Sequence, residues 1–193
     1  MINLRKIVLH STLIIAIFIG NSSCMNNKPE DTKDIAKEHN DAKFEKESSE
    51  TDAQFLVNAA EINMEEINLG KLAQENGKMN HVKELGKMME DAHSKSTYEL
   101  TNLAKTKNIT IPKSPTDKAM KAYKTLSNKS GINFDKSYSE MMVNGHKDAI
   151  AIFEKASTDC TDPEIKAWAF STLPALRKHL DHAMLCQKEY DKM

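Results

Sequence analysis

The feature that most constrains this 193-residue chain is a helical spacing of apolar residues, which recurs in four segments after residue 52. In each segment the apolar residues return every three or four positions, as they do along one face of an α-helix. Six glycines, five prolines and 6% aromatic residues are also too few for an all-β fold. We therefore predict an all-α fold, with apolar stripes over residues 55–73, 82–103, 134–156 and 165–183.

Residues that stop helices separate the four segments. Asn76-Gly77 ends the first, and Asn80 is expected to cap the second. Two prolines interrupt the following stretch before a short helix over residues 116–127, and Asp162-Pro163 opens the last segment. Long helices of similar length, one short loop and one long excursion predict a ferritin-like antiparallel four-helix bundle over residues 51–193.

The N-terminal segment is typical of an exported protein. Residues 1–23 combine a basic start, an apolar stretch too short to span a bilayer and small residues before Cys24, which predicts a signal peptide. Cys24 occupies the position of the lipidated cysteine in bacterial lipoproteins. Asn21 replaces the usual aliphatic residue three positions earlier, so ordinary cleavage without lipid is the alternative. By resemblance to lipoprotein sorting rules, Met25 indicates the outer membrane.

Residues 24–50 mix both charges with almost no apolar residue, so we predict a lipidated, disordered tether that links the domain to the membrane. Without the signal peptide, 25 basic and 28 acidic residues remain. This small negative net charge argues against nucleic acid as a partner, because nucleic-acid binding needs a basic surface. Cys160 precedes the last helix and Cys186 lies near its end, so the helical rise separates them by roughly 36 Å, too far for a disulfide.

Four polar residues interrupt the apolar stripes, one in each long helix. They are Glu66, His93, His146 and His179. Helical bundles build metal sites from such inward-facing side chains, and imidazole suits Zn, Cu, Fe and Ni. The four residues are therefore candidate ligands for one transition metal ion. The alternative is that each histidine is a hydrogen-bonded residue at the boundary of its stripe.

Other metal and catalytic sites are poorly supported. Glu90 and His93 have the Glu-x-x-His spacing of di-iron bundles, but a di-iron site needs about four core carboxylates and only Glu66 lies on a stripe. The methionines fall where core packing would place them. No phosphate-binding glycine loop, Cys-x-x-Cys pair or nucleophile elbow is present. We identify no catalytic residue.

The four segments resemble, in order, a bacterial family called domain of unknown function 4142. The resemblance rests on the run 64–73, on Met89 with His93, on 134–153 around His146, and on 173–179. It implies an exported ferritin-like bundle in which Glu66 and the three histidines fill the characteristic polar positions. The family commonly has Asp before two of the histidines and a second acid in the first helix, where this chain has Ala92, Gly145 and Asn68.

The sequence therefore leaves three functional hypotheses. The first is an envelope lipoprotein whose bundle holds one transition metal ion in a binding or stress role. The second is a metal-free helical module that interacts with another envelope protein. The third, a metal-dependent oxidoreductase, needs an open coordination position and a channel.

Overall fold

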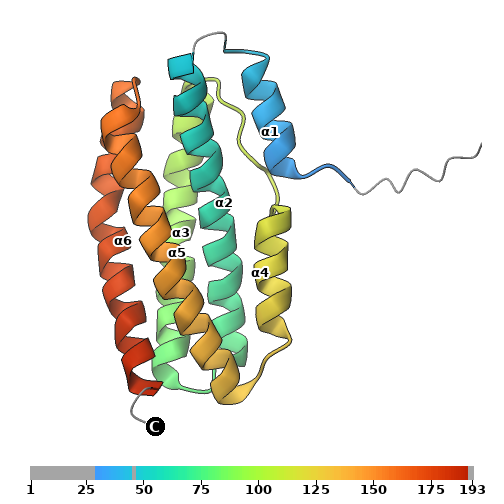
Figure 1. Cartoon of the computed structure of the whole chain (residues 1–193), viewed down its shortest axis with the longest axis vertical. Coiled ribbons are helices and arrows are strands. Elements are labelled where there is room, and N and C mark those ends of the chain that lie inside the picture. Colours follow the sequence, from blue (N-terminus) through green and yellow to red (C-terminus); the bar gives the residue numbers. More distant parts are fainter. Residues whose placement is uncertain (1–28, 45–46, 191–193) are drawn as a thin grey trace, which may run out of the picture.

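The computed structural model describes residues 29–44 and 47–190, and these residues form helices and no strands (Figure 1). The helices are α1 (Thr32–Asp41), α2 (Glu47–Asn76), α3 (Asn80–Thr106), α4 (Asp117–Ser127), α5 (Gly131–Asp159) and α6 (Pro163–Tyr190). The predicted all-α fold is confirmed, and the four long helices are those that the apolar stripes predict.

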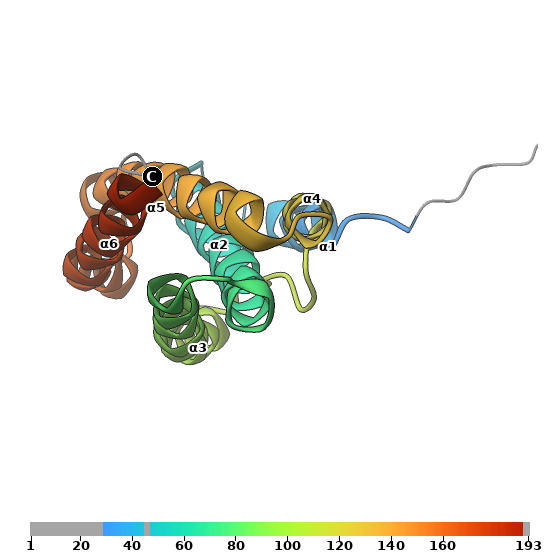
Figure 2. The same cartoon turned by 90° about the horizontal axis from the view of Figure 1, so that it is seen from below.

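The four long helices form a bundle of two antiparallel pairs. A short loop joins α2 to α3, another joins α5 to α6, and each pair packs along its length (Figure 1). The connection from α3 to α5 runs from one end of the bundle to the other and contains α4. Viewed along the bundle, α1 and α4 lie outside it, beside α2 and α5 (Figure 2).

Two buried aspartates tie the helix pairs together at opposite loops. Asp135 of α5 accepts hydrogen bonds from the backbone N–H groups of Lys78 and Met79, at 2.8 and 2.9 Å, in the loop before α3. Asp52 of α2 accepts bonds from the backbone of Thr161 and Asp162 in the loop before α6. Each carboxylate satisfies N–H groups that have no partner within their own helix.

This arrangement corrects one prediction about a helix cap. Asn80 is the first residue of α3 rather than its cap, and Met79 at the N-cap makes no side-chain capping bond. Asp135, more than fifty residues away, instead holds the segment just before the helix by accepting from the Lys78 and Met79 N–H groups. For α4 the prediction is close, because Thr116 caps the helix by accepting from Ala119 N–H.

The prediction of a disordered tether over residues 24–50 is wrong for the part that forms α1 and for the first residues of α2. The α1 helix buries Ala36 and Asn40. The Asn40 side chain donates to the Thr110 carbonyl and accepts from the Thr110 N–H, both at 2.8 Å. Lys33 forms an ion pair with the buried Glu61 at 2.6 Å. Polar contacts with distant segments therefore hold α1, although its sequence has little apolar surface.

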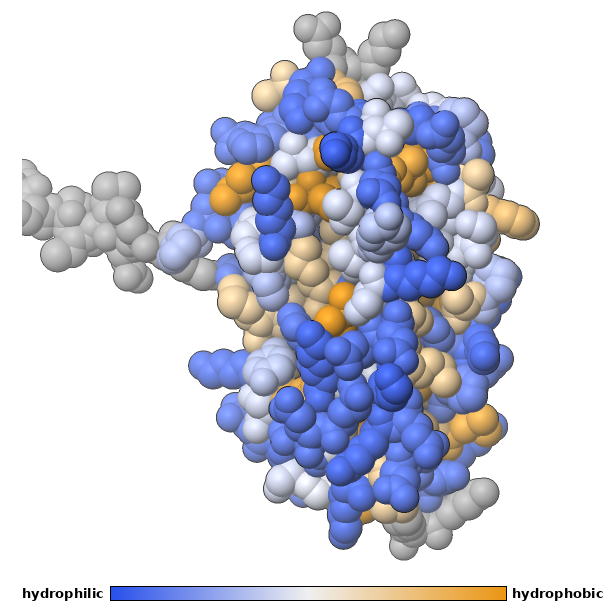
Figure 3. All heavy atoms as spheres, turned by 180° about the vertical axis from the view of Figure 1, so that it is seen from behind, coloured by the Kyte–Doolittle hydropathy of each residue, from blue (hydrophilic) through white to orange (hydrophobic). Residues whose placement is uncertain are grey.

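The signal peptide and Cys24 lie outside the described residues. No helix within the described ranges is long and apolar enough to cross a membrane. Figure 3 shows one face of the molecule, where hydrophilic residues predominate and apolar patches are small. Cys160 and Cys186 are buried free thiols, which confirms that they form no disulfide with each other.

The α2 and α3 helices approach so closely that two glycines are required where they meet. A Cβ atom on Gly86 would lie 2.7 Å from the Gly70 carbonyl oxygen and 2.8 Å from the Ala73 Cβ atom. We expect Gly86→Ala to lower the free energy of unfolding by about 1–3 kcal/mol, because the helices must move apart. Denaturant unfolding measures this loss. Lys87→Ala, at the exposed neighbouring position, is the control, and an equally stable Gly86→Ala protein would contradict the close contact.

Candidate metal centre

The three stripe histidines and Glu66 form a buried polar layer at mid-height in the bundle. One apolar cluster contains Phe55, Phe153 and their neighbours, and a second contains Phe134, Met89 and their neighbours. In each long helix, the polar residue lies between the residues that belong to one apolar cluster and the residues that belong to the other. Relative exposures are 5% for Glu66, 3% for His93, 1% for His146 and 6% for His179.

The three histidines converge on one another. One ring nitrogen from each lies within 4.8 Å of the nitrogens from the other two. The ring centroids are 5.3 to 5.7 Å apart, and the ring planes are inclined at 52 to 79°. The rings therefore meet at steep angles rather than stacking in parallel.

Hydrogen bonding fixes the tautomer of His146. Its Nδ1 lies 2.9 Å from the Met142 carbonyl oxygen one turn earlier. A carbonyl oxygen can only accept, so Nδ1 carries the hydrogen and Nε2 carries a lone pair. That Nε2 lies 3.3 Å from Nδ1 of His179. The spacing is close to the roughly 3.3–3.4 Å that separates two nitrogens bound to one tetrahedral metal ion at 2.0–2.1 Å.

His93 is oriented by a residue that sequence reasoning missed. Nδ1 of His93 lies 2.9 Å from Oδ1 of Asn63, whose amide group donates to the Ser96 hydroxyl. Because Oδ1 is an acceptor, Nδ1 of His93 carries the hydrogen and Nε2 keeps its lone pair. This Nε2 is buried and has no hydrogen-bond partner among the described residues. A signal for Asn63 existed in the sequence, since it lies one helical turn before Glu66.

Burial keeps the three imidazoles neutral. It lowers the pKa of His93 well below the ordinary value of 6.5, and it lowers the pKa values of His146 and His179 to about 4. Neighbouring histidines lower the pKa values of His93 and His179 further. At neutral pH the set therefore offers uncharged imidazoles, which is the form that binds a metal ion.

Glu66 lies beside the three histidines but is not one of the converging groups. Its Oε1 is 3.8 Å from Nδ1 of His146, on the side of the ring opposite the nitrogen that faces His179. This distance is too long for a hydrogen bond, and Nδ1 already donates to a carbonyl oxygen. Burial raises the pKa of Glu66 to about 8, so at neutral pH both groups are uncharged and form no ion pair. The structure thus brings three of the four predicted ligands together.

The donor set fits one transition metal ion. Three neutral imidazoles from α3, α5 and α6 surround a common point, and hydrogen bonds to Asn63 and Met142 orient two of the rings. Such outer contacts are the usual support of metal-binding histidines. For a metal to bind both nitrogens of the 3.3 Å pair, His179 must carry its hydrogen on Nε2, whereas without a metal its Nδ1 donates to His146.

Comparison with models of protein families identifies a family. The family model described as Domain of unknown function (DUF4142) matches residues 37–185. No curated protein and no solved structure matches the chain. Since the matched region covers well over half of the chain and includes all of the four long helices except the end of α6, the protein belongs to this family.

Proposed function

We propose that this member of the DUF4142 family binds one transition metal ion per chain through His93, His146 and His179 inside a ferritin-like four-helix bundle. The observation that carries the proposal is the convergence of one nitrogen from each ring to within 4.8 Å of the others. A neutral histidine buried for packing alone is ordinarily satisfied by hydrogen bonds. The partnerless Nε2 of His93 instead supplies a lone pair at the point of convergence.

The chemistry of the three ligands indicates which metal ions the site can bind and which kinds of function it supports. Imidazole nitrogens without a carboxylate in the set suit Zn, Cu, Ni or Fe rather than Mg or Ca. A di-iron reaction centre needs several core carboxylates, and Glu66 lies outside the converging group. The site therefore supports binding of a single metal ion better than it supports di-iron catalysis.

Metal analysis of the purified protein tests this function. The full mature chain is produced without a polyhistidine tag, incubated with zinc, freed of excess metal and analysed by mass spectrometry. We expect about one zinc ion per chain, and none in the triple variant with all three histidines replaced by alanine. Circular dichroism confirms that the variant is folded. A wild-type protein that retains no metal would overturn the proposal.

We further propose that the bundle is an envelope lipoprotein anchored to the outer membrane through Cys24. Two acyl chains bury enough methylene groups to hold a protein on a bilayer stably. Cys24→Ser is expected to abolish incorporation of labelled palmitate and to move the protein from the membrane fraction to the soluble fraction. Cys186→Ser is the control and should keep the label. Labelled Cys24→Ser protein would contradict the anchor.

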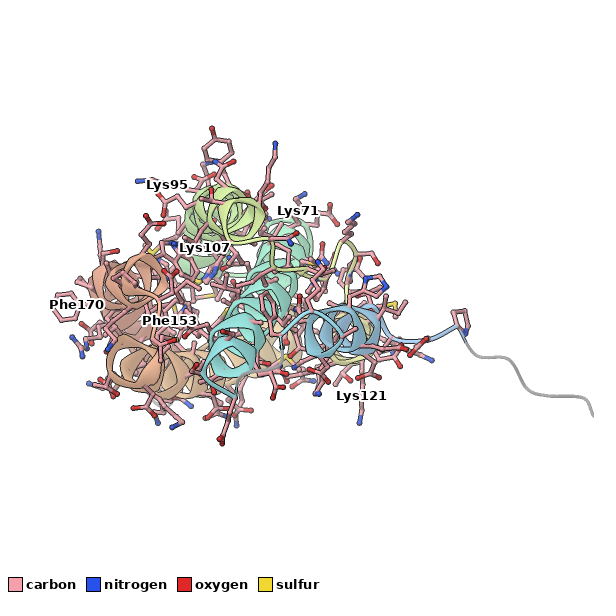
Figure 4. All side chains as sticks on the ribbon, turned by 90° about the horizontal axis from the view of Figure 1, so that it is seen from above. Lys71, Lys95, Lys107, Lys121, Phe153 and Phe170 are labelled. Atoms are coloured by element: carbon pink, nitrogen blue, oxygen red, sulfur yellow. The ribbon has the colours of Figure 1, made fainter. Side chains whose placement is uncertain are left out.

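A metal-free interaction module is the alternative function. Exposed aromatic side chains on the outer faces favour it, namely Phe170 on α6 at 69% exposure and Tyr98 on α3 at 72%. Phe170 points away from the bundle, whereas Phe153 lies among the helices (Figure 4). If the untagged protein holds no metal while Phe170→Ser and Tyr98→Ser abolish association with an envelope protein, this alternative replaces the metal-binding function.

A further inference from the structure

A small cavity lies against two of the three histidines, on the side of the bundle where α3 faces α6. Its volume is about 40 Å³, and its walls include the rings of His93 and His179. One water molecule needs roughly 10–15 Å³ of such volume, so the cavity has room for a molecule of about two or three heavy atoms. It is too small for an amino acid, a sugar or a nucleotide.

The outer part of the cavity is lined by small side chains. Ala92 and Ser96 of α3 and Thr172 and Ala175 of α6 contribute to its wall. Ala175 is exposed and the other three are partly exposed, so the cavity opens toward solvent between the two helices. Leucine at Ala92 or Ala175 would narrow this opening without altering a histidine.

The cavity lies where a ligand could complete the coordination of a metal ion held by three histidines. Three protein nitrogens leave a tetrahedral metal ion one position short of its usual four. His146 does not line the cavity, whereas both His93 and His179 do. The cavity between α3 and α6 therefore offers space for a fourth ligand beside the rings of His93 and His179.

We propose that the opening between α3 and α6 admits a small monodentate ligand, of the size of water, hydroxide or a triatomic anion, to the metal ion held by the three histidines. This inference rests on the proposed metal binding and adds the class of exogenous ligand and its route. The apolar part of the cavity includes Ile62, Phe153 and Leu176, and Asn63 provides a polar group near His93. Size rather than charge selects the ligand, because no charged side chain lines the cavity.

Azide binding to the cobalt-loaded protein tests the route. Cobalt is used because its visible absorption spectrum reports changes in its ligands. We expect azide to change the wild-type spectrum with saturation. Ala92→Leu should weaken azide binding at least about tenfold, since a single extra methylene in a pocket already changes discrimination by about 10- to 200-fold. Lys95→Leu, at a side chain that is 81% exposed on the same helix, should leave azide affinity within about twofold of wild type.

The outcomes separate the two proposals. If cobalt binds at about one ion per chain but azide leaves the spectrum unchanged, the route is wrong and metal binding stands. Azide affinity equal to wild type in Ala92→Leu would also overturn the route. Should Ala92→Leu fail to hold cobalt, Ala175→Leu on the opposite wall is expected to show the same loss of azide affinity. If cobalt does not bind the wild-type protein, both proposals fail.

Discussion

Replacing any one of His93, His146 and His179 with alanine is expected to weaken zinc binding at least about 100-fold. Loss of an outer-contact residue of a metal site commonly costs 10- to 100-fold, and loss of a ligand removes a metal bond as well. The three rings contribute one nitrogen each to the converging group, so the three variants should show losses of similar size. Competition titration against a chelator of known affinity measures each loss.

His182→Ala is the matched control for these variants, because His182 lies three residues after His179 on α6 but outside the converging group. It should bind zinc as tightly as the wild type. Zinc at 100 times its dissociation constant should also add about 2.7 kcal/mol to the unfolding free energy of the wild type. Equal zinc affinity in all three histidine variants and in the control would contradict the proposed site.

The metal-free protein is expected to be most stable near pH 7, because the two kinds of buried group act in opposite directions. Folding lowers the pKa values of His93, His146 and His179, so between pH 4.5 and 6.5 the unfolded chain binds protons that the folded protein does not. Stability therefore rises with pH in this range. Each proton contributes at most about 1.4 kcal/mol per pH unit, so the total rise amounts to several kcal/mol.

Above about pH 7 Glu66 reverses the slope of stability against pH. Its pKa in the folded protein is raised to about 8 by burial and by Glu65, whereas Lys118 lowers it. Between about pH 4.5 and 8 the folded protein keeps a proton that the unfolded chain has lost, so this group makes stability fall as the pH rises. The unfolded histidines still lose protons in this range and offset part of the effect, so a net loss of about 0.5–1 kcal/mol is expected between pH 7 and 8.

Denaturant unfolding in the presence of a chelator, repeated at a series of pH values, measures both the rise and the fall of the unfolding free energy. Glu66→Gln should remove the fall above pH 7, because the neutral amide cannot ionise. Glu75→Gln, at an exposed position on the same helix, should retain it. An unchanged profile in Glu66→Gln would show that the Glu66 carboxyl group is not protonated in the folded protein.

The helical period predicted the inward direction of His93, His146 and His179, because position along a helix fixes the direction of a side chain. The same reasoning predicted that Glu66 is buried but not that it lies outside the converging group. That offset depends on the relative height and rotation of α2 against α5, which are set by packing between distant segments. Asn63 was missed for the same reason, since its partner His93 is thirty residues away.

Long-range polar contacts account for the other differences between sequence and structure. The α1 helix depends on Asn40 bonding to Thr110, seventy residues later, and hydropathy contains no signal for such a bond. The start of α3 depends on Asp135 in the same way. Local patterns predict the type of each element well, whereas caps and attachments made across the fold become visible only when the helices are placed together.

The most direct measurement of the metal centre is X-ray absorption spectroscopy at the zinc edge on the zinc-loaded, untagged protein. Three buried histidines with one converging nitrogen each predict three imidazole nitrogens at about 2.0–2.1 Å from zinc. The triple variant with His93, His146 and His179 replaced by alanine should lose this imidazole signal. A spectrum with oxygen ligands alone, or an imidazole signal that persists in the triple variant, would contradict a metal centre at these histidines.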